Sequence, residues 1–159
     1  MCAFGSKGLA VRQYAWILLV LTGLFLFRVV AQLIQIRYPV PFLPSFEVWQ
    51  SGAVPYPLLV GSQVVIIVLC LRIVWRIFRG AVIPIRKKGS ILWYLGVAYF
   101  VIMSVRLVIG LTVAADHFWF GATLPTVFHL VLATFLLIYG RFHLSAPAAP
   151  EPLSQEANA

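Results

Sequence analysis

Four long apolar stretches, separated by short polar or proline-rich segments, make up most of the sequence. A helix needs about 20 mostly apolar residues to cross a hydrocarbon layer of about 30 Å, because it rises about 1.5 Å per residue. The strict alternation of apolar and polar positions that is typical of a membrane β-strand does not occur in the sequence. The pattern therefore predicts an all-α integral membrane protein, a bundle of four helices whose spans lie approximately at 13–37, 57–78, 91–114 and 118–142.

The segments outside these spans suggest a simple organisation. Residues 1–12 form a polar N-terminal stub, residues 13–143 form the transmembrane domain, and residues 144–159 are rich in Pro and Ala. The last segment has no apolar periodicity, so we expect a disordered cytoplasmic tail. The loop at 38–56 carries four prolines around an amphipathic stretch at 46–50, which predicts a short interfacial helix on the outer side.

Composition agrees with a membrane protein and excludes a water-soluble domain. The chain is 62% hydrophobic and 10% charged, whereas soluble domains average about 45–50% and about 25%. The formal net charge is +8, but the cations do not form the continuous solvated face that nucleic acid needs. Cys2 lies on the polar stub and Cys70 lies inside an apolar span, so both are expected to be free thiols.

Orientation follows from the positions of the cations, because loops that face the cytoplasm are enriched in Lys and Arg. Nine of the twelve cations fall on one side of a four-span topology. We therefore expect a protein that crosses the inner membrane four times and has both termini in the cytoplasm. Six of the nine follow or end the second span, and we expect them to contact anionic lipid. The nine are Lys7, Arg12, Arg72, Arg76, Arg79, Arg86, Lys87, Lys88 and Arg141, of which Arg72, Arg76, Arg79, Arg86, Lys87 and Lys88 are the expected lipid contacts.

Polar residues inside the spans are the candidates for function, since an ionisable residue there costs about 2.5–3.5 kcal/mol on insertion scales. Three spans place a polar residue at a similar depth in the outer half, and the fourth span contributes a histidine near its middle. Two acidic residues lie in the outer loops. The predicted ligand-binding layer is Arg28, Gln32, Gln63, Arg106 and His129, with Glu47 and Asp116 as its rim.

Two interpretations of this layer remain open at the level of the sequence. The two arginines can bind an anionic group, such as a carboxylate, a phosphate or a lipid headgroup, in an outward-facing pocket. Alternatively, Arg28 and Arg106 can pair with Glu47 and Asp116 and hold the outer loops against the bundle.

Enzymatic and cofactor chemistry is less well supported by the sequence. His117, His129 and His143 are separated by 12 and 14 residues, or about 18 and 21 Å along a helix, so no two of them can ligate one haem iron within a chain. We therefore expect no cofactor, no metal and no catalytic residue. The alternatives are a membrane-embedded enzyme that uses His129 on a lipid-linked or isoprenoid substrate, and a component of a transporter.

Four short motifs resemble those of small bacterial four-span inner-membrane proteins to which no function is assigned. They are the stretches at 43–49 (LPSFEVW), 55–57 (PYP), 121–125 (GATLP) and 128–129 (FH). The resemblance implies no activity, but it draws attention to the first outer loop and to His129. The predicted function is that of a non-enzymatic inner-membrane protein that binds an anionic or lipid ligand, a protein partner or a second copy of the chain.

Overall fold

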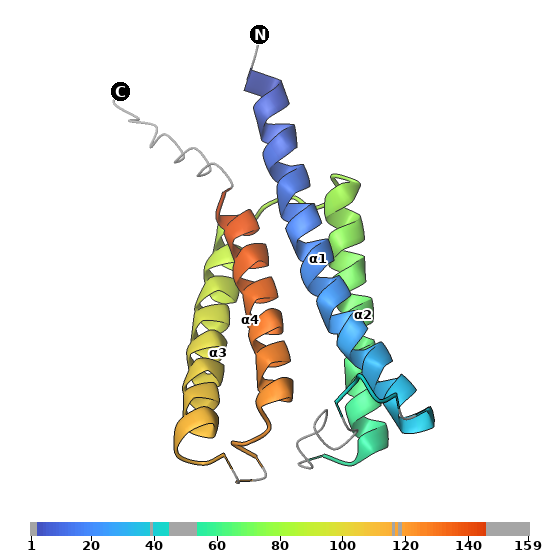
Figure 1. Cartoon of the computed structure of the whole chain (residues 1–159). Helices are drawn as coiled ribbons and strands as arrows, with labels where there is room; N and C mark the ends of the chain where they lie inside the picture. Colours follow the sequence, from blue (N-terminus) through green and yellow to red (C-terminus); the bar gives the residue numbers. More distant parts are fainter. Residues whose placement is uncertain (1–2, 39, 45–53, 116, 118, 146–159) are drawn as a thin grey trace, which may run out of the picture.

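The four predicted helices are present in the structure, a computed structural model (Figure 1). It describes residues 3–38, 40–44, 54–115, 117 and 119–145. The helices are α1 (Ala3–Arg37), α2 (Tyr56–Phe78), α3 (Arg86–Thr112) and α4 (Thr123–Leu144). No strand occurs among the described residues, and all four helices are long and apolar enough to cross a membrane. The predictions of an all-helical fold and of four candidate spans are confirmed.

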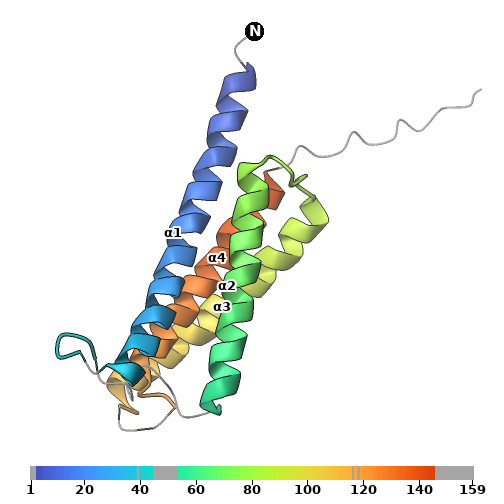
Figure 2. The same ribbon diagram turned by 90° about the vertical axis from the view of Figure 1, so that its right-hand side faces the viewer.

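The helices lie in the spatial order α2, α1, α4, α3. Close backbone approaches join α2 to α1 and α1 to α4, and the most extensive approach joins α4 to α3. Helix α1 begins at the end of the molecule where α4 ends and where α2 connects to α3 (Figures 1 and 2). The polar residues of this end, which we call the basic end, are therefore contributed by all four helices.

Two glycines set the close approach of α3 and α4. A Cβ atom added at Gly140 would lie 2.9 Å from the backbone nitrogen of Trp93, and one added at Gly96 would lie 3.0 Å from the side chain of Leu137. Both distances are shorter than van der Waals contact. Small residues at such positions allow helix backbones to approach in a membrane, where apolar surface alone gives no reason to associate.

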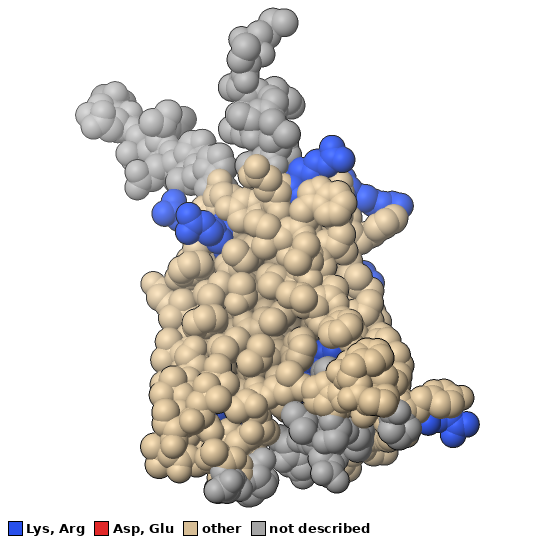
Figure 3. All heavy atoms as spheres, in the orientation of Figure 1, with Lys and Arg blue, Asp and Glu red and all other residues tan. Residues whose placement is uncertain are grey.

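The buried core lies between α1, α2 and α4. Leu18 of α1, Val74 of α2 and Phe135 of α4 belong to one cluster of buried apolar side chains. By contrast, large apolar side chains such as Leu58 and Leu111 remain exposed. The tan surface between the two ends in Figure 3 corresponds to the band that a lipid environment would cover.

Three helices begin several residues away from the starts of the expected spans. Helix α3 begins at Arg86 rather than at 91, because Arg and Lys have good helix propensity and continue the helix beyond its apolar part. Helix α1 likewise begins at Ala3, within the expected N-terminal stub. Helix α4 begins at Thr123 rather than at 118, because Nδ1 of His117 accepts hydrogen bonds from the backbone N–H groups of Trp119 and Phe120. The expected interfacial helix at 46–50 lies outside the described residues.

Candidate functional site

The predicted polar residues occupy one layer that crosses all four helices. Arg28 and Gln32 lie on α1, Gln63 on α2, Arg106 on α3 and His129 on α4. The first four are buried, with exposed fractions of 5% or less, and His129 is partly buried. We call these five residues the polar layer. Each pair of neighbouring helices is joined by one of its contacts.

Helices α2 and α1 are joined by two amides. Nε2 of Gln63 donates a long hydrogen bond of 3.4 Å to Oε1 of Gln32. Gln63 shares its helix face with Cys70, which belongs to the buried core against α1. The other polar atom of each amide, Nε2 of Gln32 and Oε1 of Gln63, is buried without a partner among the described residues. The amide pair is therefore only partly satisfied, which is costly in an apolar environment.

Helices α1 and α4 are joined through Arg28. The guanidinium carbon of Arg28 lies 5.5 Å from the centroid of the Phe128 ring. A cation at this distance from an aromatic face is attracted to it. Phe128 precedes His129 on α4, so this contact lies at the depth of the polar layer.

Helices α4 and α3 are joined by a short hydrogen bond. The hydroxyl oxygen of Tyr99 lies 2.6 Å from Nδ1 of His129, and the two rings are arranged edge to face. The tautomer of the histidine decides which group donates. Tyr99 belongs to this network of contacts, and the sequence pattern did not identify it. Its signal is the spacing of seven residues to Arg106, which places both on one face of α3.

Arg106 connects α3 to the segment that precedes α4. Its guanidinium carbon lies 4.1 Å from the centroid of the Trp119 ring, and Nη2 donates a 2.6 Å hydrogen bond to the carbonyl oxygen of Trp119. A Cβ atom added at Gly110 would overlap the backbone of Phe120, so the segment lies directly against α3. Nε of Arg106 is buried and has no hydrogen-bond partner among the described residues.

The members of the layer that carry a permanent charge are two cations on different helices, Arg28 on α1 and Arg106 on α3. The predicted rim partners Glu47 and Asp116 lie outside the described residues, as do the other two acids of the chain. Figure 3 accordingly shows no red among the described atoms. The described part of the layer thus offers cations, amides and an imidazole.

The cations at the basic end form a separate group. Most of the blue atoms visible in Figure 3 lie at the end where α2 connects to α3, and others lie in the middle of this face and at the opposite end. The guanidinium carbon of Arg79 lies 4.5 Å from the centroid of the Trp75 ring. The predicted lipid-contact residues are found together here and are exposed: Arg72, Arg76, Arg79, Arg86, Lys87 and Lys88.

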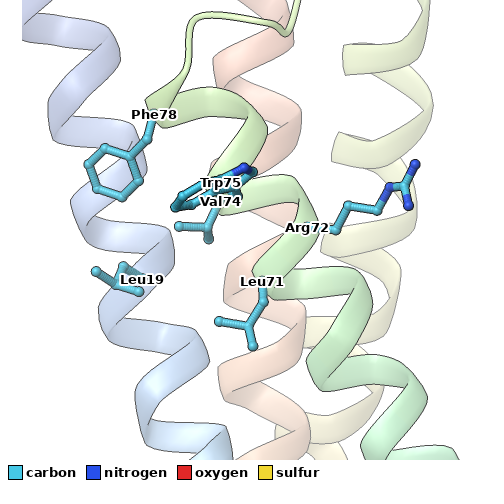
Figure 4. A pocket seen from close by; sticks show the side chains of 6 residues that line it. All are labelled: Leu19, Leu71, Arg72, Val74, Trp75 and Phe78. Carbon is cyan, nitrogen blue, oxygen red and sulfur yellow. The ribbon is translucent and has the colours of Figure 1, made fainter.

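An apolar cavity of about 550 Å³ opens between α1 and α2. Figure 4 shows that Phe78 and Trp75 of α2 approach Leu19 of α1, whereas the side chain of Arg72 points away from them. Such a lining suits a hydrocarbon chain and offers no directional polar contact.

Comparison with known proteins gives no relative: no protein-family model, no curated protein and no solved structure matches the chain. The resemblance to small bacterial inner-membrane proteins therefore stays a prediction.

Proposed function

We propose that the chain is a non-enzymatic, multi-pass inner-membrane protein with both termini in the cytoplasm, whose polar layer binds the anionic group of a small amphipathic or lipid ligand. The observation that carries this proposal is the state of Arg106. Arg106 is 5% exposed, and among the described residues its guanidinium makes one stacking contact and one hydrogen bond, both with Trp119.

The chemistry of arginine supports an anion as the missing partner. A guanidinium has five N–H donors in a planar fork that matches a carboxylate or a phosphate. The hydrogen bond to Trp119 uses one of these donors, and the buried Nε–H has no partner in the described part of the chain. An anionic group beside Arg106 would accept from the remaining donors.

The position of the second arginine supports the same ligand. Arg28 belongs to the layer on α1 and Arg106 on α3, and His129 of α4 belongs to the same layer. One anion bound by residues of the layer would join α1, α3 and α4.

The experiment compares Arg106→Gln with a matched control, Arg37→Gln. Arg37 ends α1 on the same side of the bundle as Arg106 but is exposed. Each variant is purified in dodecylmaltoside from membranes that contain phosphatidylglycerol, and native mass spectrometry measures the anionic lipid retained per folded chain.

We expect the wild type and Arg37→Gln to retain the same number of anionic lipids per chain. Arg106→Gln should retain about one fewer, because removal of a charge-assisted hydrogen bond weakens binding at this one site by about tenfold or more. Equal retention in all three proteins, or no anionic adduct on the wild type, contradicts the proposal. In that case the polar layer serves to hold the helices and outer loops together.

A further inference from the structure

A second cavity, independent of the polar layer, lies at the basic end. Its volume is about 310 Å³, and it is bounded by the last turns of α2, by residues 81–85, and by the adjoining ends of α3 and α4. The residues that give it chemical character are Arg72, Arg76, Lys88 and His143. We call it the basic cavity. Leu69 and Ile73 border it on the side that continues toward the middle of the bundle.

His143 is the buried polar group of the basic cavity. Its side chain is 1% exposed, and Nδ1 accepts a 3.0 Å hydrogen bond from the backbone N–H of Ile85. A ring nitrogen that accepts a hydrogen bond carries no proton, so the proton of the neutral ring is on Nε2. Nε2 has no partner among the described residues. The imidazole is therefore fixed by one nitrogen and has an unused donor on the other.

Three cations line the same cavity as His143. Arg72 and Arg76 are four residues apart on α2 and share one face, and Lys88 lies in the first turn of α3. The side chain of Arg72 points away from the apolar residues labelled with it in Figure 4, and Arg72 also lines the basic cavity. Arg72 precedes the end of α2 by six residues, or about 9 Å, which places it near the boundary between hydrocarbon and headgroups.

We propose that the basic cavity binds a phosphate group. His143 Nε2–H donates one hydrogen bond to a phosphate oxygen, and Arg72, Arg76 and Lys88 balance its charge. A phosphate has several acceptor oxygens and up to two negative charges, which suits three cations and one neutral donor better than a carboxylate does. The site lies 14 residues from His129 along α4, or about 21 Å, so it is distinct from the polar layer.

Two sources can supply this phosphate: an anionic lipid headgroup and a soluble phosphate. The purified full chain is titrated with dioctanoyl phosphatidic acid, with dioctanoyl phosphatidylcholine and with inorganic phosphate, and native mass spectrometry gives each apparent Kd. Tight binding of phosphatidic acid that inorganic phosphate does not displace identifies the lipid source. Displacement by inorganic phosphate at a similar concentration identifies the soluble source. Either result supports the site.

Matched double variants separate a built site from general attraction to positive charge. Arg76→Gln with Lys88→Gln removes one cation from α2 and one from α3, and both line the basic cavity. Arg79→Gln with Lys87→Gln removes the same charge from the same two segments outside the cavity lining. We expect the first pair to weaken phosphatidic acid binding by about tenfold or more, and the second pair by less than about twofold.

The histidine has its own variant. His143→Phe keeps an aromatic ring beside Tyr139, whose centroid lies 4.7 Å from the histidine ring, and removes the Nε2–H donor. We expect this variant to bind phosphatidic acid more weakly than the wild type does. If it does not fold because the N–H of Ile85 loses its acceptor, the double variants still decide the question. Equal weakening by the two pairs, or no preference for phosphatidic acid over phosphatidylcholine, overturns the proposal.

Discussion

The close contact between α3 and α4 can be tested by the substitution Gly140→Ala, which adds a single methyl group. Gly140 faces the backbone of α3, and a Cβ atom added there would lie 2.9 Å from the nitrogen of Trp93 and 3.2 Å from its Cα. The third close atom is the carbonyl oxygen of Gly89, also at 3.2 Å. All three are backbone atoms of a helix, so none can turn aside. Gly140→Ala therefore forces α3 and α4 apart by a few tenths of an ångström.

The expected magnitude follows from a comparison with Gly61→Ala. Both substitutions replace a helical glycine and gain about 1 kcal/mol of helix propensity. At Gly61 an added Cβ meets nothing within 4 Å, so only this gain applies. At Gly140 the overpacking term of about 1–3 kcal/mol acts against it. Because the propensity terms cancel, Gly140→Ala should be about 1–3 kcal/mol less stable than Gly61→Ala.

The assay is an SDS titration of each protein from dodecylmaltoside micelles, followed by tryptophan fluorescence. The wild type and the two alanine variants are compared at the same detergent concentration. We expect Gly61→Ala to unfold at a higher SDS fraction than Gly140→Ala. Equal midpoints would mean that the two helix backbones do not approach as closely as the structure has them, and the reasoning would be refuted.

Three further predictions concern the polar layer and the orientation. Tyr99→Phe loses the hydrogen bond to α4 and should lower the free energy of unfolding by about 0.5–1.5 kcal/mol in the same titration, whereas the exposed Tyr94→Phe should not change it. Gln63→Leu leaves the Gln32 amide without its partner and should cost about 1 kcal/mol or more, and the double leucine variant should regain part of that loss. Lys87→Cys in a cysteine-free chain should react with an impermeant maleimide only after the cytoplasmic side is opened; reaction in intact spheroplasts would reverse the topology.

The helices were predictable because lipid leaves the backbone so few options. Apolar length alone gave α2 its bounds to within one residue, 57–78 against Tyr56–Phe78. It failed at α4, where the hydrogen bonds of His117 hold residues 119 and 120 outside the helix. A count of apolar residues cannot detect such a contact, because Trp and Phe occur both inside membrane-spanning helices and in the interfacial segments beside them.

The sequence allowed the polar residues of the polar layer to be predicted, but not the aromatic residues that contact them. A buried Arg or Gln inside an apolar run stands out, and the structure brings Gln32 together with Gln63 as the sequence suggested. Its aromatic partners Tyr99, Phe128 and Trp119 do not stand out, since lipid-facing aromatic residues look the same in sequence. Their pairing depends on the spatial order α2, α1, α4, α3, which apolar length does not determine.

The energetics of Arg106 decide how its variant must be interpreted. An arginine in a span costs about 2.5–3.5 kcal/mol. Stacking on Trp119 stabilises the folded state by about 0.5–2 kcal/mol, and a hydrogen bond from a charged donor stabilises it by about 1.5–3 kcal/mol. The cost of inserting the arginine and the stabilisation from its two contacts are of similar size, so the fold tolerates Arg106 without any ligand. A loss of stability in Arg106→Gln therefore says nothing about binding, because the contacts with Trp119 disappear as well. Only lipid retention, counted per folded chain, reports on the donors that Trp119 leaves unused.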